Sequence, residues 1–171
     1  KLNIKNFNFF YIHSKGSSYN IENKPIDDWC DLNNYFTINK WNLNVKLLEY
    51  YDCVGINYKF YPLKHYSGNF WWTTGNHLCK LERTIGNKYL DPEMYLMNNV
   101  LINNKDNNIY IPNIICLYKS IQNHSVEKYN RENYINLSDF DIIKNISNIP
   151  FINSGDLNSI NIKRITFNCD L

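Results

Sequence analysis

Residues 65–97 read HYSGNFWWTTGNHLCKLERTIGNKYLDPEMYLM. A turn of small residues, Ser67-Gly68-Asn69, leads directly into the pair Trp71 and Trp72. The same run ends on an acidic helix start, DPEMYLM. Aromatic side chains and a carboxylate this close to a glycine turn are more typical of a binding segment than of a purely structural one. We therefore interpret the rest of the chain around this stretch.

Two helix starts are predicted within the stretch. Thr73 or Thr74 can cap a short helix, because a threonine hydroxyl accepts a hydrogen bond from a free backbone N–H of the first turn. Further on, Asp91 is predicted as the N-cap of a second helix, with Pro92 as its first helical residue.

Upstream, residues 7–12 (FNFFYI) predict a buried strand, and residues 53–60 (CVGINYKF) begin as another. Between them a helix is expected over roughly 30–50, with Asp27 and Asp28 offered as N-caps. The order strand, loop, helix, strand predicts a parallel pair in an α/β sheet.

Downstream, residues 109–118 predict one or two short strands interrupted by Pro112. A polar, Asn- and Ser-rich linker is expected to about residue 158, followed by a last strand in SINIKRITF. The predicted organisation is an α/β domain over 1–120 and, over 121–171, a linker with a short β-rich extension.

Composition sets bounds on the function. The 171 residues suit one domain with its own core, and 18 basic against 16 acidic side chains give a net charge of only +2. Because the two charges are so nearly balanced, the composition predicts no nucleic-acid partner. No apolar run approaches the ~20 residues of a membrane span. The 5 cysteines are widely spaced without a CxxC pair, which favours reduced thiols in the cytoplasm.

A His-Ser-Lys-Gly turn follows the first predicted strand, at the strand end where open α/β sheets place ligands. Lys15 can pair with a phosphate, His13 can donate a hydrogen bond, and Gly16 permits close approach of the backbone. The alternative is an ordinary strand-ending loop with a solvated lysine.

In a strand, neighbouring side chains face opposite ways, so one of Trp71 and Trp72 can be a core residue while the other lines a cleft. The alternative is that both are core residues. His65 is either a ligand-binding donor or a structural histidine.

Glu93 is the candidate general base, since deprotonating a hydroxyl requires a carboxylate held at the point of attack. The alternative is that Asp91 and Glu93 only satisfy free N–H groups at a helix start, where acidic side chains are stabilised by the helix dipole.

Taken together, five elements resemble a family of glycosyltransferase-like proteins found in bacterial polysaccharide loci and in large DNA viruses. They are YIHSKG (11–16), DDW (27–29), YYDCVGINY (50–58), HYSGNFWW (65–72) and YLDPEMYL (89–96). The resemblance covers residues 9 to about 98, just over half the chain. It implies a GT-A-like fold, a mixed sheet with flanking helices, that lacks part of the N-terminal nucleotide-binding half.

The resemblance also implies transfer of a sugar from a nucleotide-sugar donor to a glycan, a protein-linked group or another hydroxyl acceptor, in the cytoplasm (the host cytoplasm for a viral protein). His13, Lys15 and Gly16 would stabilise the donor diphosphate where many such enzymes hold a metal through Asp-x-Asp. A divalent cation, Mn²⁺ or Mg²⁺, is then possible but not required.

By the same resemblance, Glu93 and Asp91 would be the catalytic residues. The acceptor side would be lined by His65, Ser67, Gly68, Asn69, Trp71 and Trp72.

Two other functions remain open. One is a non-catalytic glycan-binding or scaffolding domain that has kept the tryptophan pair, with the chain a fragment or a degenerate relative of the enzyme. The other is a metal-dependent hydrolase using the 4 histidines, which lack ligand-type spacing.

Overall fold

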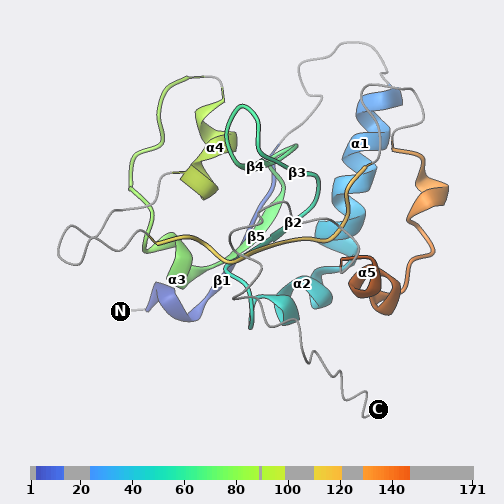
Figure 1. Ribbon diagram of the computed structural model, residues 1–171, viewed down its shortest axis with the longest axis horizontal. Helices are drawn as coiled ribbons and strands as arrows, with labels where there is room; N and C mark the ends of the chain where they lie inside the picture. The colour runs from blue at the N-terminus through green and yellow to red at the C-terminus, as the bar shows by residue number, and fades with distance from the viewer. Residues whose placement is uncertain (1–2, 14–23, 89, 99–109, 121–128, 147–171) are drawn as a thin grey trace.

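The computed structural model describes residues 3–13, 24–88, 90–98, 110–120 and 129–146. Its centre is a four-stranded mixed sheet, with the strands in the order β1 (Asn8–Tyr11), β5 (Trp71–Thr74), β2 (Cys53–Gly55) and β6 (Ile114–Cys116) (Figure 1). β5 runs antiparallel to both β1 and β2, whereas β2 and β6 are parallel. The predicted α/β class, with a mixed sheet and flanking helices, is confirmed.

The prediction that the first two strands form a parallel pair is wrong. β1 and β2 point the same way, but β5 lies between them and takes the hydrogen bonds of both. β1 is also only partly buried, because it lies at the edge of the sheet. Hydrophobic periodicity indicates that a segment is a strand, but it carries no information about which strand is its neighbour.

The helix expected over 30–50 is present in three parts. α1 (Lys24–Asn34) continues into one π-helical turn, η2 (Tyr35–Asn39), and then into α2 (Trp41–Leu47). At the junction the Lys40 N–H donates to Tyr35 O, five residues back, at 3.1 Å. The described helix already begins at Lys24, so Asp27 lies in its first turn and neither it nor Asp28 is an N-cap.

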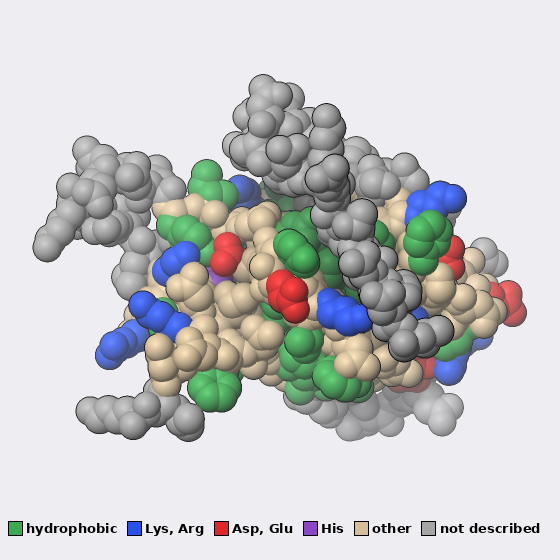
Figure 2. Space-filling model, turned by 90° about the horizontal axis from the view of Figure 1, so that it is seen from below, with side chains coloured by type: hydrophobic (Ala, Val, Ile, Leu, Met, Phe, Trp, Pro, Cys, Tyr) green, Lys and Arg blue, Asp and Glu red, His purple; other side chains and the backbone are tan. Residues whose placement is uncertain are grey.

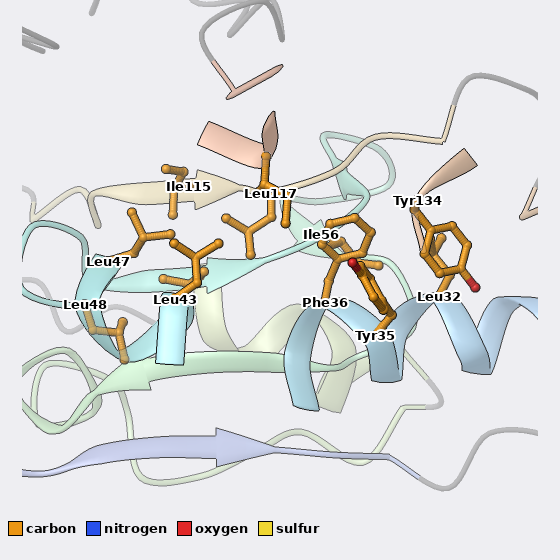
Figure 3. Packing of buried hydrophobic residues seen from close by; sticks show 12 residues of the cluster. Leu32, Tyr35, Phe36, Leu43, Leu47, Leu48, Ile56, Ile115, Leu117 and Tyr134 are labelled. Atoms are coloured by element: carbon orange, nitrogen blue, oxygen red, sulfur yellow. The ribbon is translucent and has the colours of Figure 1, made fainter. Parts of the chain in front are cut away.

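One face of the sheet is covered by these helices. Val54 in β2 belongs to the cluster that packs here. Ile56, just after β2, and Ile115 and Leu117, in and just after β6, face the leucines and aromatic residues of the helices (Figure 3). Each of these side chains contributes roughly 1.5–3 kcal/mol when fully buried. The members of this first core cluster are Leu32, Tyr35, Phe36, Leu43, Leu47, Leu48, Val54, Ile56, Ile115, Leu117, Tyr134 and Ile142.

The opposite face carries a second cluster, because alternate strand residues point to opposite sides. It contains Cys53 and Cys116 from the sheet and Leu96 and Met97 from α4 (Asp91–Asn98). A two-stranded antiparallel pair, β3 (Tyr58–Lys59) and β4 (His65–Tyr66), packs here as well.

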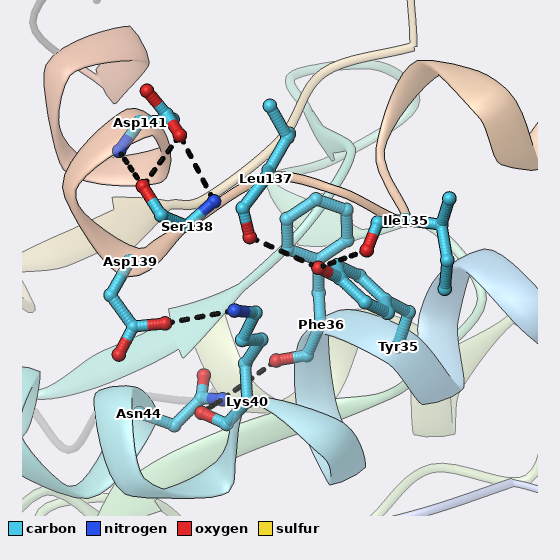
Figure 4. Close-up of polar contacts among 9 residues, drawn as sticks. All are labelled: Tyr35, Phe36, Lys40, Asn44, Ile135, Leu137, Ser138, Asp139 and Asp141. Carbon is cyan, nitrogen blue, oxygen red and sulfur yellow. Dashed lines mark hydrogen bonds and ion pairs between the residues drawn. The ribbon is translucent and has the colours of Figure 1, made fainter.

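Residues 129–146 are not a linker. They form η3 (Arg131–Asn133) and α5 (Asp139–Ile146), and they add Tyr134 and Ile142 to the first core cluster. The Tyr35 hydroxyl lies 3.1 Å from the carbonyl oxygens of Ile135 and Leu137, to which it donates (Figure 4). The predicted last strand, SINIKRITF, lies outside the described residues.

Among the described helices, which include the short η1 (Ile4–Asn6) and α3 (Gly75–Leu78), none has the length and apolar character to cross a bilayer. None of the four cysteines within the described residues forms a disulfide bond. On the face drawn in Figure 2, side chains of both charge signs are interspersed with hydrophobic ones.

Candidate functional site

Three strands end at the same edge of the sheet. In the register, Tyr11 at the end of β1 and Gly55 at the end of β2 both lie opposite Trp71, where β5 begins. Cys116 at the end of β6 lies beside Gly55. The turn that precedes β5, Ser67-Gly68-Asn69, is therefore at the carboxyl edge of β1, β2 and β6, which is the edge where open α/β sheets bind ligands.

The backbone of this turn is fixed by hydrogen bonds and by unusual torsion angles. The Ser67 N–H donates to Asn57 O and the Asn69 N–H to Tyr66 O, both at 3.1 Å. Gly68 has φ +103° and Asn69 has φ 60°. The left-handed region costs a residue with a Cβ roughly 1–2 kcal/mol, which explains the glycine.

Helix α1 closes one side of Gly68. A Cβ built on Gly68 would lie 3.2 Å from both terminal atoms of the Asn33 side chain. Asn33 is buried, and its Nδ2 donates to Trp29 O at 2.8 Å. Its Oδ1 has no hydrogen-bond partner among the residues that the structure describes. The missing Cβ at Gly68 therefore lets the buried Asn33 side chain pack against the turn.

Glu93 meets the turn directly. The Gly68 N–H donates to Glu93 Oε1 at 2.9 Å, so the first turn of α4 and the turn 67–69 are joined by a charge-assisted hydrogen bond. Glu93 is half-buried, and within the described residues its second oxygen, Oε2, makes no hydrogen bond. The carboxylate is held in place by one oxygen and keeps the other for a further partner.

Asp91 is not brought to this turn. Its Oδ2 accepts from the Lys88 N–H at 2.8 Å and lies where a Cβ on Gly86 would be. The contact closes the loop in front of α4, which starts at Asp91 itself, one residue before the predicted start. The geometry of Asp91 matches the alternative reading, in which this carboxylate only satisfies a free N–H group at the start of a helix.

The two tryptophans face opposite sides of the sheet, as strand alternation predicts. Trp71 is buried in the second cluster, stacked on Tyr11 at 4.9 Å between ring centroids, and its Nε1 donates to Asn69 Oδ1 at 2.8 Å. Trp72 is half-buried against the first cluster, and its Nε1 donates to Thr37 O at 2.8 Å. Both indole N–H groups are thus already used within the protein.

Three of the remaining predicted residues, His65, Ser67 and His13, lie in the described part of the chain. His65 is buried with its Nδ1 2.7 Å from Leu63 O, so it holds the chain before the turn. Ser67 is buried and held through its backbone. His13 is exposed, two residues beyond the end of β1. Lys15 and Gly16 lie outside the described residues.

Sequence reasoning missed two asparagines. Asn57, with φ 50°, follows β2, and its Oδ1 accepts from both the N–H and the hydroxyl of Ser120, at 2.8 and 2.9 Å. Asn33 packs against Gly68 as described above. The sequence VGIN contained a signal for Asn57, because asparagine tolerates the left-handed region. Because the chain is rich in asparagine, this one asparagine could not be distinguished from the others by sequence alone.

A buried tyrosine, Tyr66, lies directly before the turn 67–69 and is hydrogen-bonded to the strands of the sheet. The Tyr66 hydroxyl lies 2.7 Å from Ile115 O and 3.2 Å from Cys53 O, and a Cβ on Gly55 would lie 2.7 Å from its ring. Burial raises the pKa of Tyr66 well above its ordinary value, so the hydroxyl stays protonated and donates to this pair of carbonyls.

The residues that the structure describes contain no group of three or more His, Cys, Asp or Glu side chains that could hold a metal ion. Comparison of the chain with protein-family models, with curated proteins and with solved structures finds no match.

Proposed function

We propose that this protein is a glycosyltransferase with a GT-A-like fold, which moves a sugar from a nucleotide-sugar donor to a hydroxyl of a glycan or other acceptor. The observation that carries the proposal is the carboxylate of Glu93, held through Oε1 by the Gly68 N–H at 2.9 Å. It lies at the carboxyl edge of the sheet, and its Oε2 accepts no hydrogen bond from the residues that the structure describes.

The chemistry requires a base at the acceptor. In a single displacement, the acceptor oxygen bonds to the anomeric carbon of the donor sugar while the bond from that carbon to the diphosphate breaks. The acceptor proton passes to Oε2 of Glu93, and the nucleoside diphosphate leaves with the bonding electrons. A positioned general base of this kind contributes typically ~10²–10⁴-fold to the rate.

Other residues have supporting roles in this proposal. Gly68, which has no side chain, lets Asn33 pack against the turn and so fixes the position of the N–H that holds Glu93. His13, exposed beyond β1, is proposed to donate to the donor diphosphate. Lys15 and Gly16, which lie outside the described residues, are proposed to contribute to the same diphosphate site.

The test is a transfer and hydrolysis assay across a panel of nucleotide sugars, with Glu93→Gln as the variant. A glutamine oxygen still accepts from the Gly68 N–H, so the fold is preserved while the base is lost. We expect kcat to fall ~10²–10⁴-fold. Glu82→Gln, at an exposed glutamate in the loop before α4, is the matched control and should leave kcat unchanged.

Full activity in Glu93→Gln would remove Glu93 as the base. If the protein turns over no donor, shows no nucleotide affinity by calorimetry and yet binds glycans, the transferase proposal is replaced by the non-catalytic glycan-binding domain.

A further inference from the structure

Asn57 lies where the sheet meets the turn 67–69. It follows β2, precedes β3 and is only 5 % exposed. Its backbone is left-handed, with φ 50°, so the extended chain of β2 does not continue through it and changes direction. Asparagine is one of the few residues with a Cβ that adopt this region readily. Glycine would serve the backbone equally well, so the side chain of Asn57 needs a reason of its own.

The backbone of Asn57 bonds to two different segments. Its N–H donates to Tyr118 O at 2.8 Å, which extends the pairing of β2 with β6 beyond the two strands. Its carbonyl oxygen accepts from the N–H of Ser67, the first residue of the turn, at 3.1 Å. A second backbone bond of the turn, from the Asn69 N–H to Tyr66 O, is local. Of these two bonds, the one from Ser67 fixes the turn against the sheet.

The side chain of Asn57 is fixed as well. Its Oδ1 accepts from the backbone N–H of Ser120 at 2.8 Å and from the Ser120 hydroxyl at 2.9 Å. Ser120 lies shortly after β6, so this pair of bonds ties the chain that leaves β2 to the chain that leaves β6. A carbonyl oxygen with two lone pairs is then fully used, and the side chain resists rotation of the peptide that binds Ser67.

The residue after Ser67 holds the Glu93 carboxylate. The Gly68 N–H, which donates to Glu93 Oε1 at 2.9 Å, belongs to the peptide that joins Ser67 to Gly68. Movement of Ser67 away from Asn57 therefore moves this N–H and weakens its bond to the carboxylate. Reacting groups need to be held within about 0.5 Å of their productive geometry, and a misplacement of about 1 Å costs about 10²-fold in rate.

We propose that Asn57 is a positioning residue for Glu93. Through its bonds to Ser67 and Ser120, it holds the turn 67–69 at the place where the Gly68 N–H binds the carboxylate. It acts without touching a substrate. The effect on the rate rests on the proposed transferase function, whereas the contact between Gly68 and Glu93 is measurable without any substrate.

The first experiment measures the amide-proton chemical shift of Gly68 by NMR in the full chain. A neutral glutamine is a weaker acceptor than a carboxylate, so Glu93→Gln should move this signal in the otherwise unmodified protein. In an Asn57→Gly background, which keeps the left-handed backbone but removes the clamp, Glu93→Gln should lose most of its effect. In an Asn57→Asp background the effect should be retained, because an aspartate accepts both Ser120 bonds and tolerates the same torsion angle.

The matched control is Asn44→Leu. Asn44 is also a buried asparagine, but its side chain bonds to Phe36 O and Lys40 O, not to the turn. This variant should lower stability and yet leave the effect of Glu93→Gln on the Gly68 signal intact. Thermal melts check that every variant is folded. If Asn57→Gly is not, Ser120→Ala, which removes one of the two bonds to Oδ1, replaces it and should give a smaller loss in the same direction.

The second experiment uses a nucleotide sugar that the unmodified chain turns over. Asn57→Gly should lower kcat about tenfold to 10²-fold and leave the donor KM unchanged, since the loss falls on the transition state and not on donor binding. Asn44→Leu, assayed well below its melting temperature, should keep the kcat of the unmodified protein.

Three outcomes overturn the proposal. The first is an equal effect of Glu93→Gln on the Gly68 signal with and without the Asn57 side chain. The second is an equal loss in the Asn44→Leu background, which indicates general loosening of the fold. The third is absence of any effect of Glu93→Gln in the unmodified protein. A chain that turns over no donor contradicts the transferase proposal instead, and the Gly68 signal alone then decides the role of Asn57.

Discussion

Gly68 and Glu93 show how a site can depend on a single torsion angle. With φ at +103°, the N–H of Gly68 points at Glu93, and the missing Cβ leaves room for the Asn33 side chain. The sequence allowed both residues to be named as candidates. It did not predict their contact, because the distance between a turn and a later helix depends on how that helix packs.

His77 is the residue from which we expect a pH effect on stability. It is buried, with Nε2 2.9 Å from Leu96 O and Nδ1 3.1 Å from the Tyr110 hydroxyl. Burial lowers the pKa of His77, and this outweighs the hydrogen bond to Leu96 O, which acts in the opposite direction. The neutral ring therefore donates to Leu96 O and accepts from Tyr110.

Because the folded pKa is lowered, the unfolded chain takes up the proton first as the pH falls. The contribution of His77 is complete above its unfolded pKa of about 6.5 and is lost as the pH falls through the folded value. Urea unfolding from pH 7.5 to 5 should show a slope of up to about 1.4 kcal/mol per pH unit from this group. His77→Gln should remove that component and the exposed control His13→Gln should keep it; the reverse result would contradict the assignment.

At the scale of the element, the segment from α1 to α2 is informative because its α-helical hydrogen-bond pattern is interrupted by a π-helical turn. Leu32, Phe36, Leu43 and Leu47 recur at the spacing of one helix face, and all four are buried in the first core cluster. The π-turn between them was not predicted. It arises because Lys40 N–H bonds to Tyr35 O, which leaves Phe36 O without the donor that an α-helix would supply.

Asn44 fills that gap. Its Nδ2 donates to Phe36 O at 2.7 Å and to Lys40 O at 2.8 Å (Figure 4). Asn44→Leu, similar in size, should lower the free energy of unfolding by about 1–3 kcal/mol, because a buried carbonyl then has no partner. Chemical denaturation measures this. The control is Asn42→Leu, at an exposed position on α2, and equal effects of the two substitutions would argue against the capping role.

At the scale of the whole molecule, the boundary placed at residue 120 is where sequence reasoning was least informative. The stretch after it is polar on average, yet Tyr134 and Ile142 are buried in the first core cluster. A few apolar residues spaced along a polar segment can complete a core without raising its mean hydropathy. The class of the fold followed from strong periodic segments, whereas this packing depended on isolated side chains.

A truncation series tests that packing. A chain ending at residue 120 exposes the cluster around Tyr35 and Phe36 and removes the ion pair of Lys40 with Asp139, 3.0 Å long. We expect it to lose its cooperative thermal transition, since two large buried side chains contribute roughly 3–6 kcal/mol. A chain ending at 146 keeps these contacts and should melt cooperatively. Cooperative melting of the shorter chain would make 129–146 dispensable.

The order of the strands also bears on how fast this protein folds. Asn8 pairs with Thr74 and Cys53 pairs with Ile114, so neighbours in the sheet are distant along the chain. Each such pairing must close a long loop before its hydrogen bonds form, and domains dominated by non-local pairings fold in milliseconds to seconds rather than microseconds. During synthesis the sheet stays incomplete until β6 has left the ribosome, and until then β2 offers an unpaired edge to other chains.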